Sequence, residues 1–334
     1  MDSGSNYKNL RVFVTGAGGF IGSHLVEALV RAGAKVRPLV RYTSRGSWGN
    51  LEQLTPEVRD SLDVVLGDIR DAQFIRNHAR DCDVIFHLAA LIGIPYSYEA
   101  SDSYIDTNLR GTLNILQAAR ELEVPRTVIT STSEVYGTAR YTPIDEAHPL
   151  QAQSPYSASK IAADKLAESY HLSFALPVVT VRPFNTYGPR QSSRAVIPTI
   201  VSQLLAGTET LRLGSVDPVR DLLYVEDTVR GFLGAGVAEQ AIGQVINLGT
   251  GHGISIGDLA RAIMSIVGRE VPIVEDAERV RPEASEVRLL VAKFDVAKKV
   301  LGWEPRVALA EGLKKVADYV GSNMGAYRVG SYVV

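Results

Sequence analysis

A glycine-rich turn near the start of the chain constrains the fold more than any other feature. The apolar run Leu10–Thr15 leads directly into Gly16-Ala-Gly-Gly-Phe-Ile-Gly22, and a helical apolar period follows. Gly16, Gly19 and Gly22 stand at three-residue spacing. A turn this tight needs residues without a Cβ atom, so that backbone N–H groups at the helix N-terminus can approach a pyrophosphate. The pattern therefore predicts a strand–turn–helix unit that binds a dinucleotide.

Short apolar runs and helical periods alternate through about the first 180 residues. The runs are nearly continuous in β-branched and apolar residues, which is typical of strands buried on both faces of a parallel sheet. This alternation predicts an α/β fold, a Rossmann-type doubly wound parallel sheet. The predicted strands are Leu10–Thr15, Lys35–Val40, Asp63–Leu66, Asp83–Leu88, Thr127–Thr130 and Val178–Val181, and the helices after the first are Asp71–Arg80, Ile105–Glu121 and Pro155–Leu172.

The second half of the chain lacks this regular alternation and predicts a smaller α+β substrate-binding domain. We place the dinucleotide-binding domain at residues 8–185, with segment 222–250 returning to it, and the substrate-binding domain mainly at 186–322. Residues 1–7 and 323–334 are expected to form flexible tails. The helices expected in this half are Val196–Leu205, Glu226–Gly236, Ser255–Val267, Asp295–Leu301 and Ala310–Val320, and the expected strand is Gln244–Leu248.

Composition excludes several classes of protein. The 35 Lys and Arg residues nearly balance the 37 Asp and Glu residues, so no charge excess favours nucleic acid or an anionic membrane surface as a partner. No apolar run approaches the roughly 18 residues of a membrane helix, and the polar start of the chain lacks a signal-peptide core. Cys82 is the one cysteine, so an intrachain disulfide or a thiolate metal cluster is impossible. We expect a cytoplasmic protein without a metal site.

Candidate contacts for the dinucleotide recur at the ends of the predicted strands, where a sheet of this type binds its ligand. Asp68 follows the third strand and can hydrogen-bond an adenine amino group, and the small residues after His87 leave room for the dinucleotide. Taken singly, each of these positions is more simply explained as a strand end. The candidate cofactor-binding residues in and beyond the glycine turn are Gly16, Gly19, Phe20, Ile21, Gly22, Asp68, Ile69, Leu88, Ala89, Ala90 and Asn108.

The end of the second strand bears on the choice of cofactor. An acidic residue there usually binds the ribose 2′-hydroxyl of NAD, whereas an arginine suits the 2′-phosphate of NADP. Arg41 and Arg45 follow this strand without a carboxylate between them. Both can instead be solvated loop residues, but their presence favours NADP over NAD.

Tyr156 and Lys160 stand four residues apart at the start of a predicted helix and therefore lie on one face of it. A free phenol has a pKa of about 10, too high for a base at neutral pH. A neighbouring ammonium group and an oxidised nicotinamide both favour the phenolate. Tyr156 is therefore predicted to take a proton from a sugar hydroxyl while hydride leaves the same carbon, and both residues are also candidate cofactor contacts.

The fifth predicted strand ends in hydroxyl groups and a carboxylate. Thr132 can hydrogen-bond the hydroxyl that Tyr156 deprotonates, and Ser133 follows it. Glu134 can remove the proton next to a newly formed ketone. The alternative for Glu134 is a surface carboxylate or a helix-capping acceptor.

Taken together, these residues resemble the extended short-chain dehydrogenase/reductase family, specifically its nucleotide-sugar epimerases and dehydratases. The resemblance covers nearly the whole chain and implies a nucleotide-sugar substrate. Its motifs are Thr15–Gly22, His87–Ala90, Ser131–Gly137, the Tyr156–Lys160 pair, Arg182–Gln191 and Arg220–Asp227.

Within that family, the residues at the end of the fifth strand distinguish the chemistries. Thymidine-diphosphate-glucose 4,6-dehydratases carry Thr-Asp-Glu there, GDP-mannose 4,6-dehydratases carry Thr-Ser-Glu as this chain does, and simple 4-epimerases usually lack the Glu. Segments 39–51 and 92–98 resemble dehydratases of the legionaminic-acid pathway, which act on nucleotide-linked N-acetylglucosamine, by resemblance the GDP form. Arg41 and Arg45 depart from that group, so its cofactor preference does not carry over.

The resemblance also implies roles in substrate binding. Asn185 would contact the sugar or pyrophosphate, Val196 would line the base pocket, and Arg220 and Arg281 would reach the diphosphate or nucleotide. For each arginine the alternative is a surface ion pair. The nucleotide (GDP, UDP, dTDP or CDP) and the sugar stay open. The family further implies a homodimer formed by the helices that contain Tyr156 and residues 105–121.

These observations predict a nucleotide-sugar 4,6-dehydratase that uses NAD(P) catalytically. Tyr156, with Lys160 and Thr132, would deprotonate O4 as the C4 hydride moves to the nicotinamide, and Glu134 would remove the C5 proton. Water would leave C6 with Ser133, a bound water or protonated Glu134 as the acid, and the hydride would return to C6 to give a 4-keto-6-deoxy sugar. The alternative is a C4-epimerase, which shares the first step. A noncatalytic dinucleotide sensor is disfavoured, because such proteins typically lack the Tyr–Lys pair.

Overall fold

A seven-stranded parallel sheet forms the larger part of the protein. The computed structural model describes residues 6–327 and 329. The strand order is β10-β6-β5-β4-β1-β2-β3, so the chain winds outward from β1 in both directions. This is the predicted Rossmann-type sheet. Its strands are β1 (Arg11–Thr15), β2 (Lys35–Arg41), β3 (Val65–Gly67), β4 (Val84–His87), β5 (Arg126–Thr130), β6 (Val178–Pro183) and β10 (Val245–Leu248).

Side-chain alternation along the strands builds a separate core on each face of this sheet. On β1, Val12 and Val14 join one apolar cluster, while Phe13, between them, joins the other. Both clusters are buried because helices cover both faces, as strands without a polar face require. The helices of this part are α1 (Phe20–Arg31), α2 (Pro56–Arg59), α3 (Ala72–His78), α4 (Ile94–Glu99), α5 (Ser101–Tyr104), α6 (Gly111–Glu121), α7 (Pro155–Phe174) and α9 (Val225–Val237).

The predicted helix over residues 105–121 differs in the structure. Helical backbone begins earlier, at Ser101, and passes through a π-helical turn at Ile105–Arg110 before α6. Such turns insert an extra residue into a helix and occur frequently at functional sites. Sequence periodicity does not reveal this turn, because the apolar positions of α6 itself keep their ordinary spacing.

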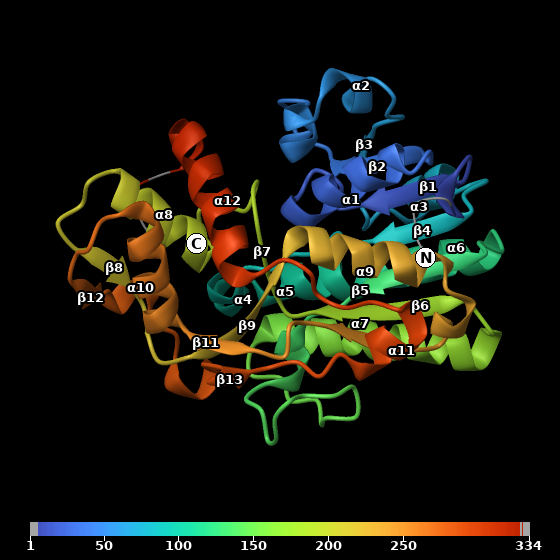
Figure 1. Cartoon of the computed structure of the whole chain (residues 1–334). Coiled ribbons are helices and arrows are strands. Elements are labelled where there is room, and N and C mark those ends of the chain that lie inside the picture. The colour runs from blue at the N-terminus through green and yellow to red at the C-terminus, as the bar shows by residue number, and fades with distance from the viewer. Residues whose placement is uncertain (1–5, 328, 330–334) are drawn as a thin grey trace.

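The smaller part is a helical layer over short strands, gathered at the left of Figure 1. Strand β9 pairs with β11, β13 and β7, and β8 pairs with β12. These short strands are absent from the sequence-based prediction. The elements are β7 (Asn185–Tyr187), α8 (Val196–Leu205), β8 (Leu211–Leu213), β9 (Val219–Tyr224), β11 (Gly253–Ser255), α10 (Ile256–Val267), β12 (Ile273–Glu275), β13 (Leu289–Leu290) and α12 (Leu309–Ser322). Helix α11 (Asp295–Leu301) instead packs against β10 and α9 of the larger part (Figure 1).

Two residues predicted to lie in flexible tails are packed instead. The Tyr7 ring is fully buried and its hydroxyl donates to the backbone oxygen of Leu233 at 2.7 Å. Tyr327 is 9% exposed and packs against the same apolar cluster. Burial of an aromatic ring compensates the entropy lost when the chain is ordered. Residues 1–5, 328 and 330–334 of the predicted tails lie outside the described residues.

Among the residues described, no helix is long and apolar enough to cross a membrane.

Candidate active site

A cleft of about 960 Å³ follows the carboxyl edge of the large sheet and is closed on its other side by the smaller part. Arg45, Asn108 and Lys160 do not line it. All the other residues proposed from the sequence do. They are Gly16, Gly19, Phe20, Ile21, Gly22, Arg41, Asp68, Ile69, Leu88, Ala89, Ala90, Thr132, Ser133, Glu134, Tyr156, Asn185, Val196, Arg220 and Arg281.

The glycine turn has the geometry that a dinucleotide requires. Gly16 has φ +69°, and a Cβ atom there would stand 2.6 Å from the backbone nitrogen of Ala89. Helix α1 begins directly after Gly19, with no side chain capping its N-terminus and no acidic residue in its first turn. Its first N–H groups therefore face the cleft as an anion-binding site. These residues fit the pyrophosphate of a dinucleotide.

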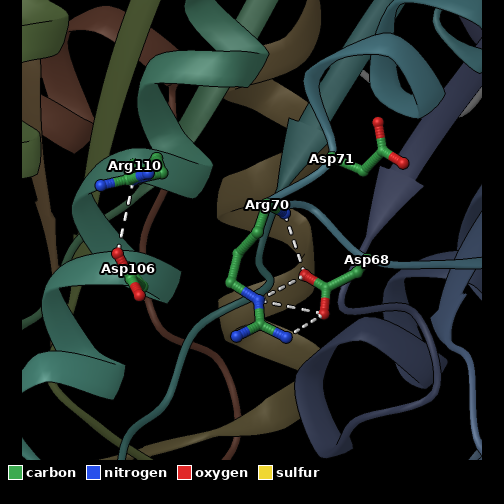
Figure 2. A pocket seen from close by; sticks show the side chains of 5 residues that line it. All are labelled: Asp68, Arg70, Asp71, Asp106 and Arg110. Atoms are coloured by element: carbon green, nitrogen blue, oxygen red, sulfur yellow. Dashed lines mark hydrogen bonds and ion pairs between the residues drawn. The ribbon is translucent and has the colours of Figure 1, made fainter.

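Asp68 lies at the end of β3 with its carboxylate already engaged. The Arg70 guanidinium donates to it at 2.6 Å, and the backbone N–H of Arg70 donates at 2.9 Å (Figure 2). These hydrogen bonds, foremost that of the Arg70 side chain, lower the pKa of Asp68, and the nearby charge of Arg41 adds to the effect. Asp68 is therefore held as a carboxylate that can accept from an adenine amino group.

Asp68 and Arg70 also border a second pocket of about 410 Å³, shared with Asp71, Asp106 and Arg110. Figure 2 shows the Asp106–Arg110 pair across from the Asp68–Arg70 pair. Asp71 caps α3 by accepting from the backbone N–H of Phe74. Two of the three carboxylates are thus paired with arginines, whereas Asp71 forms only the cap of α3.

The two arginines after β2 separate in the structure. Arg41 ends the strand and lines the cleft, whereas Arg45 is exposed and lies outside the lining residues. Only Arg41 is placed to contact a ligand in the cleft.

Helix α7 begins immediately before Tyr156 and Lys160, the pair that the sequence predicts to be catalytic. Ser154 and Ser157 cap each other's backbone N–H groups, and Pro155 occupies the first turn, where its missing N–H costs nothing. This fixed start places Tyr156 at the floor of the cleft, 7% exposed. Lys160, one turn further on, is 4% exposed and donates from Nζ to the backbone oxygen of Thr130 at 2.6 Å.

The main influences on the pKa of Tyr156 do not include Lys160, which the sequence predicts to favour the phenolate together with an oxidised nicotinamide. Burial raises the pKa of Tyr156, a hydrogen bond with Thr132 partly offsets this, and the charge of Glu134 raises it further. The Lys160 ammonium group is directed at the end of β5 rather than at the phenol. The phenol needs additional positive charge nearby before it can act as a base at neutral pH.

The segment after β5 brings a carboxylate into the cleft. Thr132 caps the 3₁₀ turn Ser133–Tyr136 by accepting from the backbone N–H of Glu134 at 3.2 Å. Gly137 ends this turn with φ +63°. The Glu134 side chain is half-buried, and its charge acts on both Tyr156 and Arg220. Glu134 is thus neither a surface carboxylate nor a side-chain cap.

Two arginines on the opposite side of the cleft share one carboxylate that sequence analysis missed. Arg220, on β9, donates to Glu286 at 3.0 Å, and Arg281 stands 3.8 Å from the same carboxylate oxygen. Burial lowers the pKa of Arg220, and the charges of Glu134 and Glu286 oppose that shift. Glu286 has no local sequence signal, because it reaches the arginines only through the folding of segment 277–288.

Two further predicted residues have distinct environments. The Oδ1 atom of Asn185 is buried at the cleft without a hydrogen-bond partner among the described residues, so it can accept from a ligand. Asn108, in the π-helical turn, binds Leu91 through two backbone hydrogen bonds and donates to Ser159 on α7. Asn108 therefore positions α7 and the loop after β4 and does not line the cleft.

Arg194 is a second residue that sequence analysis missed. It lines the cleft from the segment before α8 and is exposed, and its charge acts on Tyr104. Tyr104 in turn packs edge-on against Tyr156 with ring centroids 6.2 Å apart. Within the described residues, no cluster of His, Cys, Asp and Glu has the arrangement of a metal site.

The chain matches the family model described as GDP-mannose 4,6 dehydratase over residues 13–316. It is 35% identical over 316 residues to the UDP-glucose 4-epimerase of Mycolicibacterium smegmatis, covering 93% of this chain and 98% of that protein. It is 33% identical over 322 residues to the dTDP-glucose 4,6-dehydratase of an Actinoplanes species, covering 94% and 98%.

A solved structure agrees with these similarities. DesIV, a dTDP-glucose 4,6-dehydratase from Streptomyces venezuelae crystallised with NAD bound, has a TM-score of 0.86 and 31% identity, covering 96% of this chain and 99% of that chain. Dehydratases and epimerases are both represented among the proteins that this chain resembles.

Proposed function

Because this chain belongs to the extended short-chain dehydrogenase/reductase family of nucleotide-sugar dehydratases and epimerases, it is an enzyme of that kind, and we propose that it is a nucleotide-sugar 4,6-dehydratase. The observation that carries the proposal is the position of Glu134, half-buried in the cleft between Tyr156 and Arg220. An elimination needs a base beside the oxidised sugar carbon, and this carboxylate is placed to serve as one.

In the oxidation step, Tyr156 takes the proton from O4 of the sugar while Thr132 holds the same hydroxyl. Lys160, buried one helical turn from Tyr156, would help to hold the cofactor and would add positive charge that favours the phenolate. A bound NAD(P) supplies reversible hydride transfer, so the overall reaction causes no net oxidation. NAD in the relative's crystal structure supports this cofactor class.

In the elimination step, the C4 ketone makes the C5 proton acidic and Glu134 removes it. Water then leaves C6, with Ser133, a bound water or the protonated Glu134 supplying the acid. The elimination leaves a double bond between C5 and C6. Return to C6 of the hydride that left C4, together with a proton at C5, gives a 4-keto-6-deoxy sugar still attached to its nucleotide.

The substrate is a nucleotide-linked hexose, and nucleotide-linked N-acetylglucosamine is a member of that class to test. The planar guanidinium groups of Arg220 and Arg281 can each hydrogen-bond the diphosphate. Asn185 also lines the cleft, and its Oδ1 atom, which has no hydrogen-bond partner among the described residues, can accept a hydrogen bond from the ligand. Glu286 holds both arginines, so the diphosphate competes with this carboxylate when it binds. Val196 borders the same end of the cleft and lines the base pocket.

Replacement of Glu134 by Gln tests the elimination. With a panel of nucleotide sugars, the wild-type protein is expected to yield a product lighter by one water molecule in mass spectrometry. Dehydration by Glu134→Gln should fall about a hundredfold, because an acid–base group of this kind contributes about that factor. The exposed Glu283 provides a matched control, since Glu283→Gln lies outside the cleft.

The second candidate function is a C4-epimerase, which the similarity to the Mycolicibacterium epimerase favours. An epimerase uses the same oxidation step and then returns hydride to the other face of the sugar. A product of unchanged mass and altered stereochemistry, with Glu134→Gln as active as wild type, would replace the dehydratase proposal with this one.

We propose that the site prefers NADP to NAD. Arg41 lines the cleft at the end of β2, where no acidic residue stands to bind a ribose 2′-hydroxyl. Its guanidinium suits a 2′-phosphate, so the site accepts NADP as well as NAD, with preference for NADP.

We also propose that the protein forms a homodimer through α6 and α7. Leu172 near the end of α7 is 77% exposed, and Phe174 beside it is 47% exposed and carries Arg120 of α6 over its ring. The exposed apolar side chains belong to α7, and α6 borders them through Arg120; an exposed apolar patch of this kind is typical of an interface between subunits.

A further inference from the structure

A buried carboxylate on α7 lies one turn beyond Lys160. Asp164 is 4% exposed, and its Oδ2 atom accepts three hydrogen bonds: one from the Ser131 hydroxyl at 2.7 Å and two from the Arg182 guanidinium at 3.0 and 2.9 Å. Its Oδ1 atom has no hydrogen-bond partner among the described residues. Asp164 therefore joins α7 to β6 and to the end of β5.

Ser131, which donates this hydrogen bond to Asp164, directly follows β5. Ser131 stands between Thr130, whose backbone oxygen accepts from Lys160, and Thr132, which contacts Tyr156. A shift of this residue moves both contacts together. The Asp164 carboxylate thus fixes the strand end against the helix that carries the catalytic pair.

The other end of the network supports the turn that contains Glu134. Arg182 donates from Nη1 to the Tyr136 hydroxyl at 2.9 Å, and that hydroxyl donates to Asn247 on β10 at 2.7 Å. Tyr136 lies in the same 3₁₀ turn as Glu134. The network therefore reaches both the oxidation residues and the proposed elimination base.

Stability alone does not account for this pair. Taking Asp164 and Arg182 out of water costs several kcal/mol per ion, and apolar residues of similar volume often replace a buried pair without loss. A buried pair whose hydrogen bonds end on the segments that hold the active site is better explained by what it positions.

The charges that face Lys160 give Asp164 a second role. Burial lowers the pKa of Lys160, and the Asp164 carboxylate opposes that shift. His87, facing it from β4, is neutral, since burial lowers its pKa to about 3, and Tyr156 on the same helix is a neutral phenol because burial raises its pKa. From β5, Lys160 meets only the backbone oxygen of Thr130.

The charged and titratable groups around Asp164 come from β6 and from the segment after β5. Arg182 on β6 lies against it, and Arg182 is in turn influenced by the Tyr136 hydroxyl. Glu146 acts at the far side of Tyr136. Asp164, one helical turn from Lys160, is thus the carboxylate of this network that acts on the lysine.

We propose that Asp164 is a positioning residue of the active site, which fixes the end of β5 through Ser131 and keeps Lys160 an ammonium ion beside Tyr156. The inference rests on the proposed function only in giving Lys160 its role with the cofactor and Tyr156. It applies equally to dehydration and epimerisation, which share that step.

The test compares variants over a pH series with two readouts, turnover and NAD affinity measured by calorimetric titration. In Asp164→Asn the alkaline decline of both is expected at a lower pH than in wild type, because Lys160 loses its proton more readily. Asp164→Glu should restore the wild-type decline. Glu168→Gln, on the exposed face of α7, is the matched control and should leave both profiles unchanged.

Two further variants keep the test decisive. Ser131→Ala retains the Asp164 charge and is expected to lower kcat about tenfold without moving the alkaline decline. If Asp164→Asn fails to fold because it leaves Arg182 unpaired, Asp164→Asn combined with Arg182→Gln removes both charges and should still shift the decline. An NAD-binding profile that is unshifted in the folded variant would overturn the proposal. If the profile shifts but the wild-type protein dehydrates no nucleotide sugar, the result counts against the proposed function alone.

Discussion

Ion pairing decides which side chains are available to a ligand at the scale of single residues. Arg220 and Arg281 share Glu286, so their charges are partly neutralised before an anion arrives. Arg41 forms no side-chain hydrogen bond or ion pair within the described residues, and its charge acts on Asp68. A cation that is not committed within the protein loses little when it binds a phosphate.

Arg41→Ala is therefore expected to weaken NADP binding about tenfold relative to NAD binding, which corresponds to roughly 1.4 kcal/mol. Arg45→Ala is the matched control, because Arg45 follows the same strand but lies outside the cleft. Fluorescence titration with NADPH and NADH measures both affinities. An unchanged affinity ratio in Arg41→Ala would remove this arginine as the phosphate contact.

At the scale of elements, buried polar groups fix the strand ends that form the floor of the cleft. His87 ends β4 and hydrogen-bonds Thr15 of β1 at 2.8 Å and Thr112 of α6 at 3.1 Å. Burial lowers the pKa of His87 to about 3, and the charge of Lys160 contributes. The imidazole is neutral in the folded protein at neutral pH and ties three elements together.

This environment predicts a pH-dependent stability. His87 is protonated near pH 6.5 in the unfolded state but only near pH 3 in the folded state. Its contribution to the free energy of unfolding is therefore fully present above pH 6.5 and is lost as the pH falls towards 3. One proton accounts for at most about 1.4 kcal/mol per pH unit. His87→Gln should unfold at lower denaturant concentration at pH 7.5 yet lose less stability on acidification.

Urea unfolding at several pH values measures this slope. The exposed His252 provides the control, since His252→Gln is expected to follow the wild-type curve. His24, whose pKa burial lowers to about 4, leaves a residual slope in His87→Gln. A slope as steep in His87→Gln as in wild type would show that His87 does not titrate on unfolding.

At the scale of the whole molecule, the cleft exists only because two distant parts of the chain meet. Tyr156 and Glu134 come from the large sheet and its helices, whereas Arg220 and Glu286 come from the smaller part. The exposed apolar side chains Leu172 and Phe174 of α7 do not line this cleft and are the basis of the proposed dimer.

Sedimentation velocity at micromolar concentration is expected to give a dimer. Leu172→Lys should shift the protein towards the monomer, because it places a charge in the proposed apolar interface. Leu205→Lys, at an exposed leucine of α8, is the control and should remain dimeric. A wild-type protein that sediments only as a monomer would refute the interface.

The sequence by itself determined the large sheet, the glycine turn and the Tyr156–Lys160 pair. Each depends on neighbours along the chain: an apolar run of strand length, glycines at fixed spacing, or two side chains one helical turn apart. In the smaller part, β13 escaped prediction because it has only two residues, and β9 because its partners β7, β11 and β13 are short strands distant from it in the sequence.

Only the tertiary structure decided which charges meet. Glu286 hydrogen-bonds Arg220, which lies 66 positions away in the sequence, and Asp164 of α7 hydrogen-bonds Arg182 of β6. Arg41 lines the cleft, whereas Arg45 is not among its lining residues. Local periodicity carries no information about such pairs, because they form when separately folded elements pack together and each buried charge must find a partner.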